Sequence, residues 1–309
     1  MMRDFRRLMV VLIAVFAIAG CAVTQEYSQF AQAGTNYYKA LDDLLIKSGD
    51  LFVDTDSERL LSDRAKFLAD FQEKQKEGDL SKNEIEQLKK GIEKNLEEDY
   101  ANKKANDEKN QKIILQLRAH AALLGDYFNV MNQLATSPAP TNISQSIGSI
   151  TTNLQTIGNL LRISAPNPGI FQQIVPLVVS SVIAAKLRKE LQERNQLIQT
   201  ELLTQQELLD FLKKQIQRNL NLTKEIREKR LKNEFLSFQT LISPDTWIAN
   251  RRQIIKWQNT VKELGAAQAA AKSLVQAYQS LVSGEITLDK FNAMLVNLQP
   301  IIKAAESFN

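Results

Sequence analysis

Apolar residues recur at every third or fourth position along most of the chain. One such series runs from Ile85 to Tyr100, and another runs from Leu187 to Leu220. This period matches one face of an α-helix. Alternation of period two, which would indicate a β-strand, is not sustained over any stretch long enough to form one. The pattern therefore predicts an all-α fold.

The same pattern predicts about six helices, near residues 25–47, 57–78, 81–134, 170–241, 245–283 and 287–307. At about 1.5 Å per residue, the third would be roughly 80 Å long and the fourth about 100 Å if unbroken. Helices of this length are stabilised mainly by neighbours packed along them. We therefore expect an elongated up-and-down bundle of long helices.

Two residue pairs fit a pattern that marks the start of a helix. Thr55 with Glu58, and Ser81 with Glu84, match the S/T-x-x-E capping box. In this motif the hydroxyl and the carboxylate each accept a hydrogen bond from a free backbone amide at the helix start. We therefore expect one helix to begin just after Thr55 and another just after Ser81.

A turn between two helices is predicted near residue 243. Ser243 followed by Pro244 places an N-cap residue directly before a proline at the first helical position. Gly284, with Thr287 after it, indicates the end of that helix and the start of another.

The N-terminus has the arrangement of an export signal. Arg3, Arg6 and Arg7 form a basic segment, and Leu8 to Gly20 is a 13-residue apolar run. The run is shorter than the roughly 20 residues that a helix needs to span a bilayer. A basic segment followed by a short apolar run is typical of a signal peptide.

The apolar run ends in Ile18-Ala19-Gly20-Cys21, which resembles the lipobox of bacterial lipoproteins. No family is recognised for the mature domain. The resemblance implies that the thiol of Cys21 receives a diacylglycerol, that the signal is cut just before it, and that the new α-amine is acylated. Three acyl chains bind a membrane far more firmly than one. The alternative is an unmodified thiol, either after an ordinary signal peptide or inside a short anchor helix.

The resemblance also implies a location and a division of the chain. In lipoproteins an Asp after the lipidated cysteine tends to retain the protein in the inner membrane, whereas Ala22 occupies that position here and implies the outer membrane. Residues 1–20 are then the signal peptide. Residues 21–309 form a single all-helical domain that is lipid-anchored at the bacterial outer membrane, at its periplasmic face; orientation toward the cell exterior stays open.

The residue counts exclude several kinds of chemistry. The 309 residues include one Cys and one His, whereas a structural zinc or haem site needs several such ligands. His120 lies among alanines in a helical stretch, where a structural or surface histidine is expected rather than a catalytic one. No phosphate-binding, dinucleotide-binding, metalloprotease or serine-hydrolase motif is present. We therefore expect no enzyme activity, no catalytic residues, no metal and no cofactor.

The mature chain is nearly neutral. Removing Arg3, Asp4, Arg6 and Arg7 with the signal leaves 36 of the 39 basic residues and 34 of the 35 acidic ones. The charge balance therefore gives no reason to expect nucleic acid as a partner, and an exported protein is in the wrong compartment for it.

Charged side chains are almost absent from the middle of the chain. Residues 113–185 contain only Arg118, Asp126 and Arg162. Within this region, Ile174 to Ala185 is apolar except for two serines. The first interpretation is a helical hairpin in the middle of the bundle, because an apolar run of about 12 residues is usually a buried helix. The alternative is a tip that inserts into a membrane or docks a partner. That layout resembles the hemolysin E class of α-helical pore-forming proteins in arrangement, with no shared motif.

Basic residues gather on both sides of the turn predicted at Ser243 and Pro244. If the two flanking helices are antiparallel, residues equidistant from the turn are neighbours and form one basic patch. Counting helices from Cys21 places this patch at the anchored end, where it could meet anionic headgroups. An ordinary solvated helix face is the alternative. The patch comprises Arg227, Lys229, Arg230, Lys232, Arg251, Arg252 and Lys256.

Two classes of function follow from these patterns. The first is a non-enzymatic lipoprotein that acts as a scaffold, spacer or protein-binding module, held to the membrane through the lipid on Cys21 and bound to a protein partner in the cell envelope. The second is a membrane-active protein that inserts its charge-poor hairpin, or one that sequesters an apolar ligand. Whether the other helices cover residues 113–185 distinguishes the two.

Overall fold

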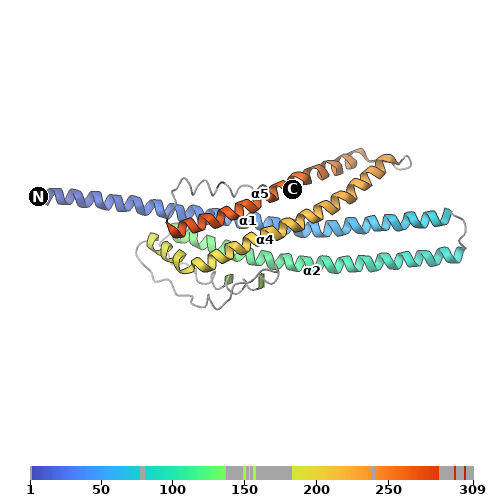
Figure 1. The fold of residues 1–309 in the computed structure, drawn as a ribbon, viewed down its shortest axis with the longest axis horizontal. Helices are drawn as coiled ribbons and strands as arrows, with labels where there is room; N and C mark the ends of the chain where they lie inside the picture. The colour runs from blue at the N-terminus through green and yellow to red at the C-terminus, as the bar shows by residue number, and fades with distance from the viewer. Residues whose placement is uncertain are drawn as a thin grey trace.

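Long helices make up nearly all of the described part of the protein in this computed structural model (Figure 1). Residues 2–76, 81–136, 149–150, 153, 156–157, 183–237, 241–284, 296 and 303 are described, with 2–24, 183–188, 258–264, 266–267 and 270 described by their backbone alone. Within these residues there is no strand, so the prediction of an all-α fold is confirmed. The four long helices are α1 (Met2–Lys76), α2 (Lys82–Thr136), α4 (Ile183–Leu236) and α5 (Pro244–Ser283).

The helices predicted at residues 25–47 and 57–78 are one continuous helix, α1. No cap forms at Thr55: its hydroxyl donates to the backbone oxygen of Leu51 at 2.7 Å and lies 2.9 Å from the hydroxyl of Thr223 on α4. Glu58 likewise pairs with α4 rather than with a helix start. The expected helix start at Thr55 is therefore wrong, because both side chains of the apparent capping box make tertiary contacts on a buried face that continues through residue 58.

The second capping box does start a helix. The Ser81 amide donates to Oε2 of Glu84 at 2.8 Å, and the Glu84 amide donates to the Ser81 hydroxyl at 3.3 Å. This reciprocal pair satisfies two amides that have no partner within the helix. It also lowers the pKa of the Glu84 carboxyl, chiefly through the hydrogen bonds from Ser81. The resulting helix, α2, matches the prediction for residues 81–134 closely.

The signals predicted for both ends of α5 are also confirmed. Ser243 is extended and Pro244 occupies the first helical turn, although the Ser243 hydroxyl contacts Thr246 rather than capping an amide. Gly284 has φ 69°, in the left-handed region, and its amide donates to the Ser280 carbonyl at 3.0 Å. A left-handed glycine ends a helix without the steric cost that a Cβ would add. Thr287 lies outside the described residues.

Two helical hairpins lie side by side in the bundle (Figure 1). One is formed by α1 and α2, the other by α4 and α5, and α1 packs against α4. The C-terminal ends of α1 and α4 both lie at the end of the molecule remote from the N-terminus, where the two hairpins diverge (Figure 1). The elongated up-and-down arrangement is therefore confirmed, with a fork at one end.

This arrangement corrects the predicted position of the turn between α4 and α5. Counting two helices between Cys21 and residue 78 placed the turn beside the anchor. Because a single helix covers this range, the direction of every later helix is reversed, and the turn lies at the end remote from Cys21 (Figure 1).

The core lies at the unforked end and is rich in aromatic side chains. Phe30 of α1 meets Phe128 of α2 edge to face, with ring centroids 5.4 Å apart, and Tyr278 of α5 lies 5.9 Å from Phe30. Gly34 and Gly125 allow α1 and α2 to approach closely, since a Cβ at either position would overlap an aromatic ring of the other helix.

The described part of the charge-poor region belongs to this core. On α2, residues 114, 117, 121, 124, 127, 128, 131, 134 and 135 are buried in the apolar cluster. This portion of α2 is therefore buried along one face, and the hairpin predicted for the whole of residues 113–185 stays a prediction. Most of residues 137–182, and most of the helix predicted at 287–307, lie outside the described residues.

Candidate functional site

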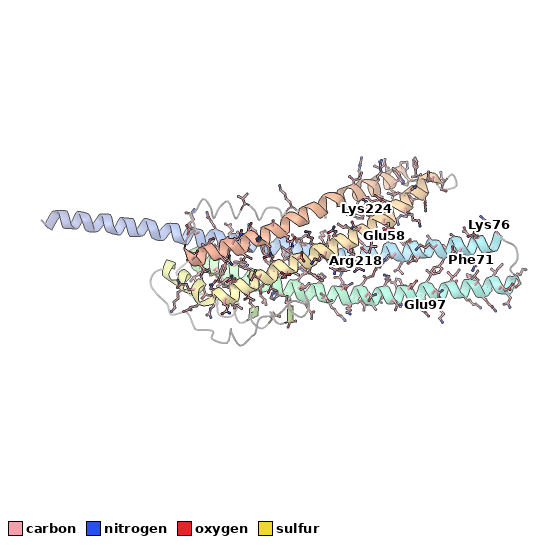
Figure 2. The ribbon with its side chains drawn as sticks, viewed as in Figure 1. Glu58, Phe71, Lys76, Glu97, Arg218 and Lys224 are labelled. Carbon is pink, nitrogen blue, oxygen red and sulfur yellow. The ribbon has the colours of Figure 1, made fainter. Side chains whose placement is uncertain are left out.

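Two of the seven residues of the predicted basic patch, Arg227 and Arg230, form hydrogen bonds between helices of the bundle. Glu58 of α1 is buried and accepts hydrogen bonds from two arginines of α4: Nε of Arg227 at 2.7 Å and Nη1 of Arg230 at 2.8 Å. Figure 2 labels Glu58 where α1 passes alongside α4. Charge-assisted hydrogen bonds of this length are the strong ones. Arg227 and Arg230 therefore join the two hairpins just before they diverge.

Arg227 also ties α4 to α5. Its Nη1 donates to Gln253 at 2.6 Å, and its guanidinium lies 4.9 Å from the ring centroid of Trp257. One guanidinium thus contacts a carboxylate, an amide and an aromatic face on two neighbouring helices. Arg227 was predicted as part of the basic patch, but it packs between helices instead.

The other five patch residues are exposed, and the structure does bring them to one end of the molecule. Because α4 and α5 are antiparallel, the basic residues that precede and follow the turn share the tip of the second hairpin. Within the described residues, none of the five takes part in an ion pair. These residues, named here the basic collar, are Lys229, Lys232, Arg251, Arg252 and Lys256.

The tip is held together by aromatic contacts. The rings of Phe235 and Trp247 are 5.8 Å apart, and the indole Nε1 of Trp247 donates to the backbone oxygen of Leu231 at 3.1 Å. The Arg251 guanidinium lies 5.8 Å from the Trp247 ring. Trp247 and Trp257, which fall on one stripe of α5, therefore both stabilise the hairpin through arginine and aromatic neighbours.

The single histidine belongs to a buried polar cluster. Nε2 of His120 lies 3.0 Å from Oε1 of Glu201 on α4, and both side chains are fully buried. Gln205 donates to the same carboxylate oxygen at 2.6 Å. Burial by itself lowers the pKa of His120, but the charge of Glu201 and its hydrogen bond outweigh burial, so the pKa is raised. A protonated His120 paired with Glu201 therefore lies inside the bundle over a wider pH range than a free histidine would.

A second polar cluster lies along the same helix. Glu190 is fully buried, with Nε of Arg194 3.5 Å from its Oε1. Burial raises the pKa of Glu190 to about 7, and the charge of Arg194 opposes that rise only in part. Tyr127 and Tyr278 are buried near it, and burial followed by the charge on Glu190 raises the pKa of the Tyr278 hydroxyl.

These buried groups lie apart from the groove between α1 and α4. The groove of about 520 Å³ at the fork is lined by residues of α1 and α4 such as Leu61, Ala69 and Ile226, and it includes no member of either polar cluster. Among the described residues, no group of three or more His, Cys, Asp or Glu side chains could hold a metal ion. The first cluster joins α2 to α4 through His120 and Glu201, whereas the charged pair of the second, Glu190 and Arg194, lies within α4.

Sequence reasoning missed the partners of His120. It placed the histidine correctly in mid-helix but did not pair it with Glu201, and it did not single out Glu190. The signal was present: Glu190, Arg194 and Glu201 follow the same helical stripe as the apolar residues of α4, at positions where a packed helix is expected to be apolar. Charged residues on such a stripe indicate buried pairs, either within the helix, as for Glu190 and Arg194, or with a neighbouring helix, as for Glu201 and His120.

Cys21 lies within α1, six residues before the buried Tyr27. Among the described residues, no helix is long and apolar enough to cross a membrane. No protein-family model, curated protein or solved structure matches this chain.

Proposed function

We propose that this protein is a lipid-anchored lipoprotein of the bacterial cell envelope, a non-enzymatic spacer and protein-binding scaffold at the periplasmic face of the outer membrane. The observation that carries the proposal is the continuity of α1. The lipobox cysteine and the first core residue, Tyr27, lie on the same helix, with no linker between them. A lipid on Cys21 would therefore be joined rigidly to the bundle.

The dimensions of the bundle support a spacer. Residues 21–76 of α1 would extend for roughly 84 Å at about 1.5 Å per residue. An isolated helix of this length would bend, but α1 packs against both α2 and α4. The ion pair of Arg118 with Asp42, at 2.6 Å, and that of Lys103 with Asp56, at 2.8 Å, connect α1 to α2 along its length. The bundle would thus hold its forked end at a fixed distance from the membrane anchor.

The alternative, a membrane-active protein or one that sequesters an apolar ligand, has less support. It requires the charge-poor region to leave the core or to surround a ligand. The described part of that region, on α2, packs in the apolar cluster, where Phe128 meets Phe30 of α1. Extracting it would expose side chains such as Leu117 and Phe128, at about 25 cal/mol for each Å² of apolar surface.

Lipidation and location can be tested together in cells. We expect the protein to incorporate an alkyne-labelled palmitate and to fractionate with the outer membrane. Cys21→Ala should abolish labelling and leave an uncleaved precursor, whereas the matched variant Val23→Ala should behave as the unsubstituted chain. Ala22→Asp should move the labelled protein to the inner membrane. Labelling that persists in Cys21→Ala would refute the anchor.

Orientation and the spacer role need a second measurement. Protease added to intact cells should leave the protein uncut, whereas protease added after the outer membrane is opened should cut it. Site-specific crosslinkers at exposed positions near the fork, such as Leu68 and Tyr100, should capture a defined envelope protein. The same crosslinker at Leu203, nearer the anchored end, provides the comparison. Identical products at all three positions would argue against a dedicated partner at the forked end.

A further inference from the structure

Exposed apolar side chains concentrate at the tip of the second hairpin. Twelve large apolar residues are exposed in the described part of the chain, and four of them fall within residues 235–248. Leu241 is completely exposed and Phe235 is 67% exposed. Contiguous exposed apolar side chains at one place indicate a binding surface, whereas scattered ones do not. These four residues, named here the apolar cap, are Phe235, Leu236, Leu241 and Ile248.

The basic collar lies directly behind the apolar cap on the same two helices. Lys232 is one helical turn before Leu236 on α4, and Arg252 is one turn after Ile248 on α5. The described residues at 227–237 and 241–257 include seven basic and three acidic side chains. In the first hairpin, by contrast, lysines such as Lys89 and Lys94 pair with glutamates one turn away.

The cap and the collar are held in fixed relative positions. The Phe235 and Trp247 rings and the Trp247 hydrogen bond to Leu231 connect α4 to α5 at the tip. Further back, Arg227 connects both helices to α1. The helix ends that carry Phe235, Leu236, Ile248 and the basic collar are therefore ordered before they meet a ligand, which reduces the entropy lost on binding.

We infer that the tip of the hairpin formed by α4 and α5 binds the interface of an anionic lipid bilayer. Basic side chains attract anionic headgroups, and exposed Phe, Leu and Ile side chains enter the boundary between headgroups and acyl chains. A soluble anionic polymer would satisfy the collar but would leave the apolar cap in water. The pairing of both features on one tip therefore favours a bilayer over a polymer or an acidic protein.

The position of the tip gives this surface a role beyond the proposed function. Glu58, which anchors the base of the hairpin, is roughly 55 Å from Cys21 along α1 at about 1.5 Å per residue. The tip lies further out at the same end (Figure 1). The protein would thus have two attachments to lipid at opposite ends of the bundle, one covalent and one reversible.

The test uses the mature chain, residues 21–309, with Cys21→Ser, so that lipidation of the anchor cannot contribute. We expect it to float with vesicles of phosphatidylethanolamine and phosphatidylglycerol, and to stay at the bottom of the gradient with phosphatidylcholine vesicles. Replacing Lys232, Arg251 and Arg252 with Gln should weaken binding on the order of 100-fold, since each basic side chain near an anionic surface contributes about a factor of five. Replacing Lys89, Lys90 and Lys94 with Gln in the first hairpin is the matched control and should leave binding unchanged.

The apolar cap is tested separately. Leu236→Ser, Leu241→Ser and Ile248→Ser together should weaken binding to vesicles. The binding that remains should be more sensitive to salt, because it depends on the basic collar alone. Leu115→Ser with Leu203→Ser, two comparably exposed positions elsewhere, is the control and should have no effect. With Trp257→Phe leaving Trp247 as the only tryptophan, vesicle binding should shift its fluorescence to the blue, and brominated lipids should quench it.

Three outcomes would overturn the inference. The first is equal binding to anionic and neutral vesicles, and the second is equal loss in the tip variants and their controls. The third is that a soluble polyanion binds as tightly as the vesicles do, and that the substitutions in the apolar cap leave this binding unchanged. None of these results depends on lipidation of Cys21, so failure here is distinguishable from failure of the proposed function.

Discussion

The pH dependence of stability should depend strongly on Glu190. This carboxyl is fully buried on α4, and its pKa is raised by burial from 4.5 to about 7. A carboxyl with a raised pKa binds its proton more tightly in the folded chain than in the unfolded one. Its contribution to stability is therefore fully present below pH 4.5 and is lost as the pH rises through 7.

The size of the effect follows from the two pKa values. Between pH 5 and pH 8, linkage to Glu190 alone should lower the free energy of unfolding by about 2.5 kcal/mol. His120 adds to the same trend, because the pKa of a histidine paired with a buried carboxylate is raised and its contribution is also lost as the pH rises. The bundle should therefore be more stable at mildly acidic pH than at pH 8.

Urea unfolding of the mature chain with Cys21→Ser, followed by circular dichroism between pH 5 and pH 8, measures this dependence. Glu190→Gln should remove most of the slope, since the amide does not titrate. Glu225→Gln, at an exposed position far along the same helix, should leave the slope unchanged. A slope of opposite sign, or one that survives in Glu190→Gln, would show that the buried carboxyl does not control stability.

Two further substitutions test the packing of the helices. Glu58→Ala leaves two arginines of α4 without their carboxylate, and thermal unfolding should show that the free energy of unfolding falls by about 2 kcal/mol. This value is in the lower part of the range for hydrogen bonds to charged groups, because one of the arginines is partly exposed. The control Glu97→Ala, at an exposed position, should change the free energy of unfolding by less than about 0.5 kcal/mol. Gly34→Ala places a methyl group against the buried ring of Phe128 and should cost about 1–3 kcal/mol. Gly91→Ala, where nothing lies near the new methyl group, should stabilise the chain by up to about 1 kcal/mol; equal effects at the two glycines would contradict the close approach of α1 and α2.

Helix content and several helix ends could be predicted because they depend on nearby residues. The capping box at Ser81 and Glu84, and the glycine at position 284, act within one turn of the backbone that they terminate. Thr55 and Glu58 show the limit of such signals. They match the same local motif, yet their side chains point to α4, and no local rule states whether a neighbouring helix will offer Thr223 or Arg227 as a better partner.

The basic patch likewise could be predicted only as far as it depends on nearby residues. The sequence grouped the basic residues that flank Ser243 and Pro244, because antiparallel helices that follow each other closely in the chain bring these flanks together. It could not separate Arg227 from Lys229, which differ in burial and not in charge. The sequence also placed the whole patch at the anchored end of the bundle. This was wrong because two helices were predicted where α1 is a single helix, which reverses the direction of every helix that follows.

The sequence by itself determined that the chain is helical and where α2 and α5 begin and end, and it contains, at Ile18 to Cys21, the residues that resemble a lipobox. These features follow from periodicity, backbone geometry and motifs that act over a few residues. Only the tertiary structure decided which charged residues are buried as pairs, which remain free at the tip, and at which end of the bundle that tip lies. A local pattern can indicate that a charged residue is buried, but it does not identify a partner more than a hundred positions away, as Arg227 is from Glu58.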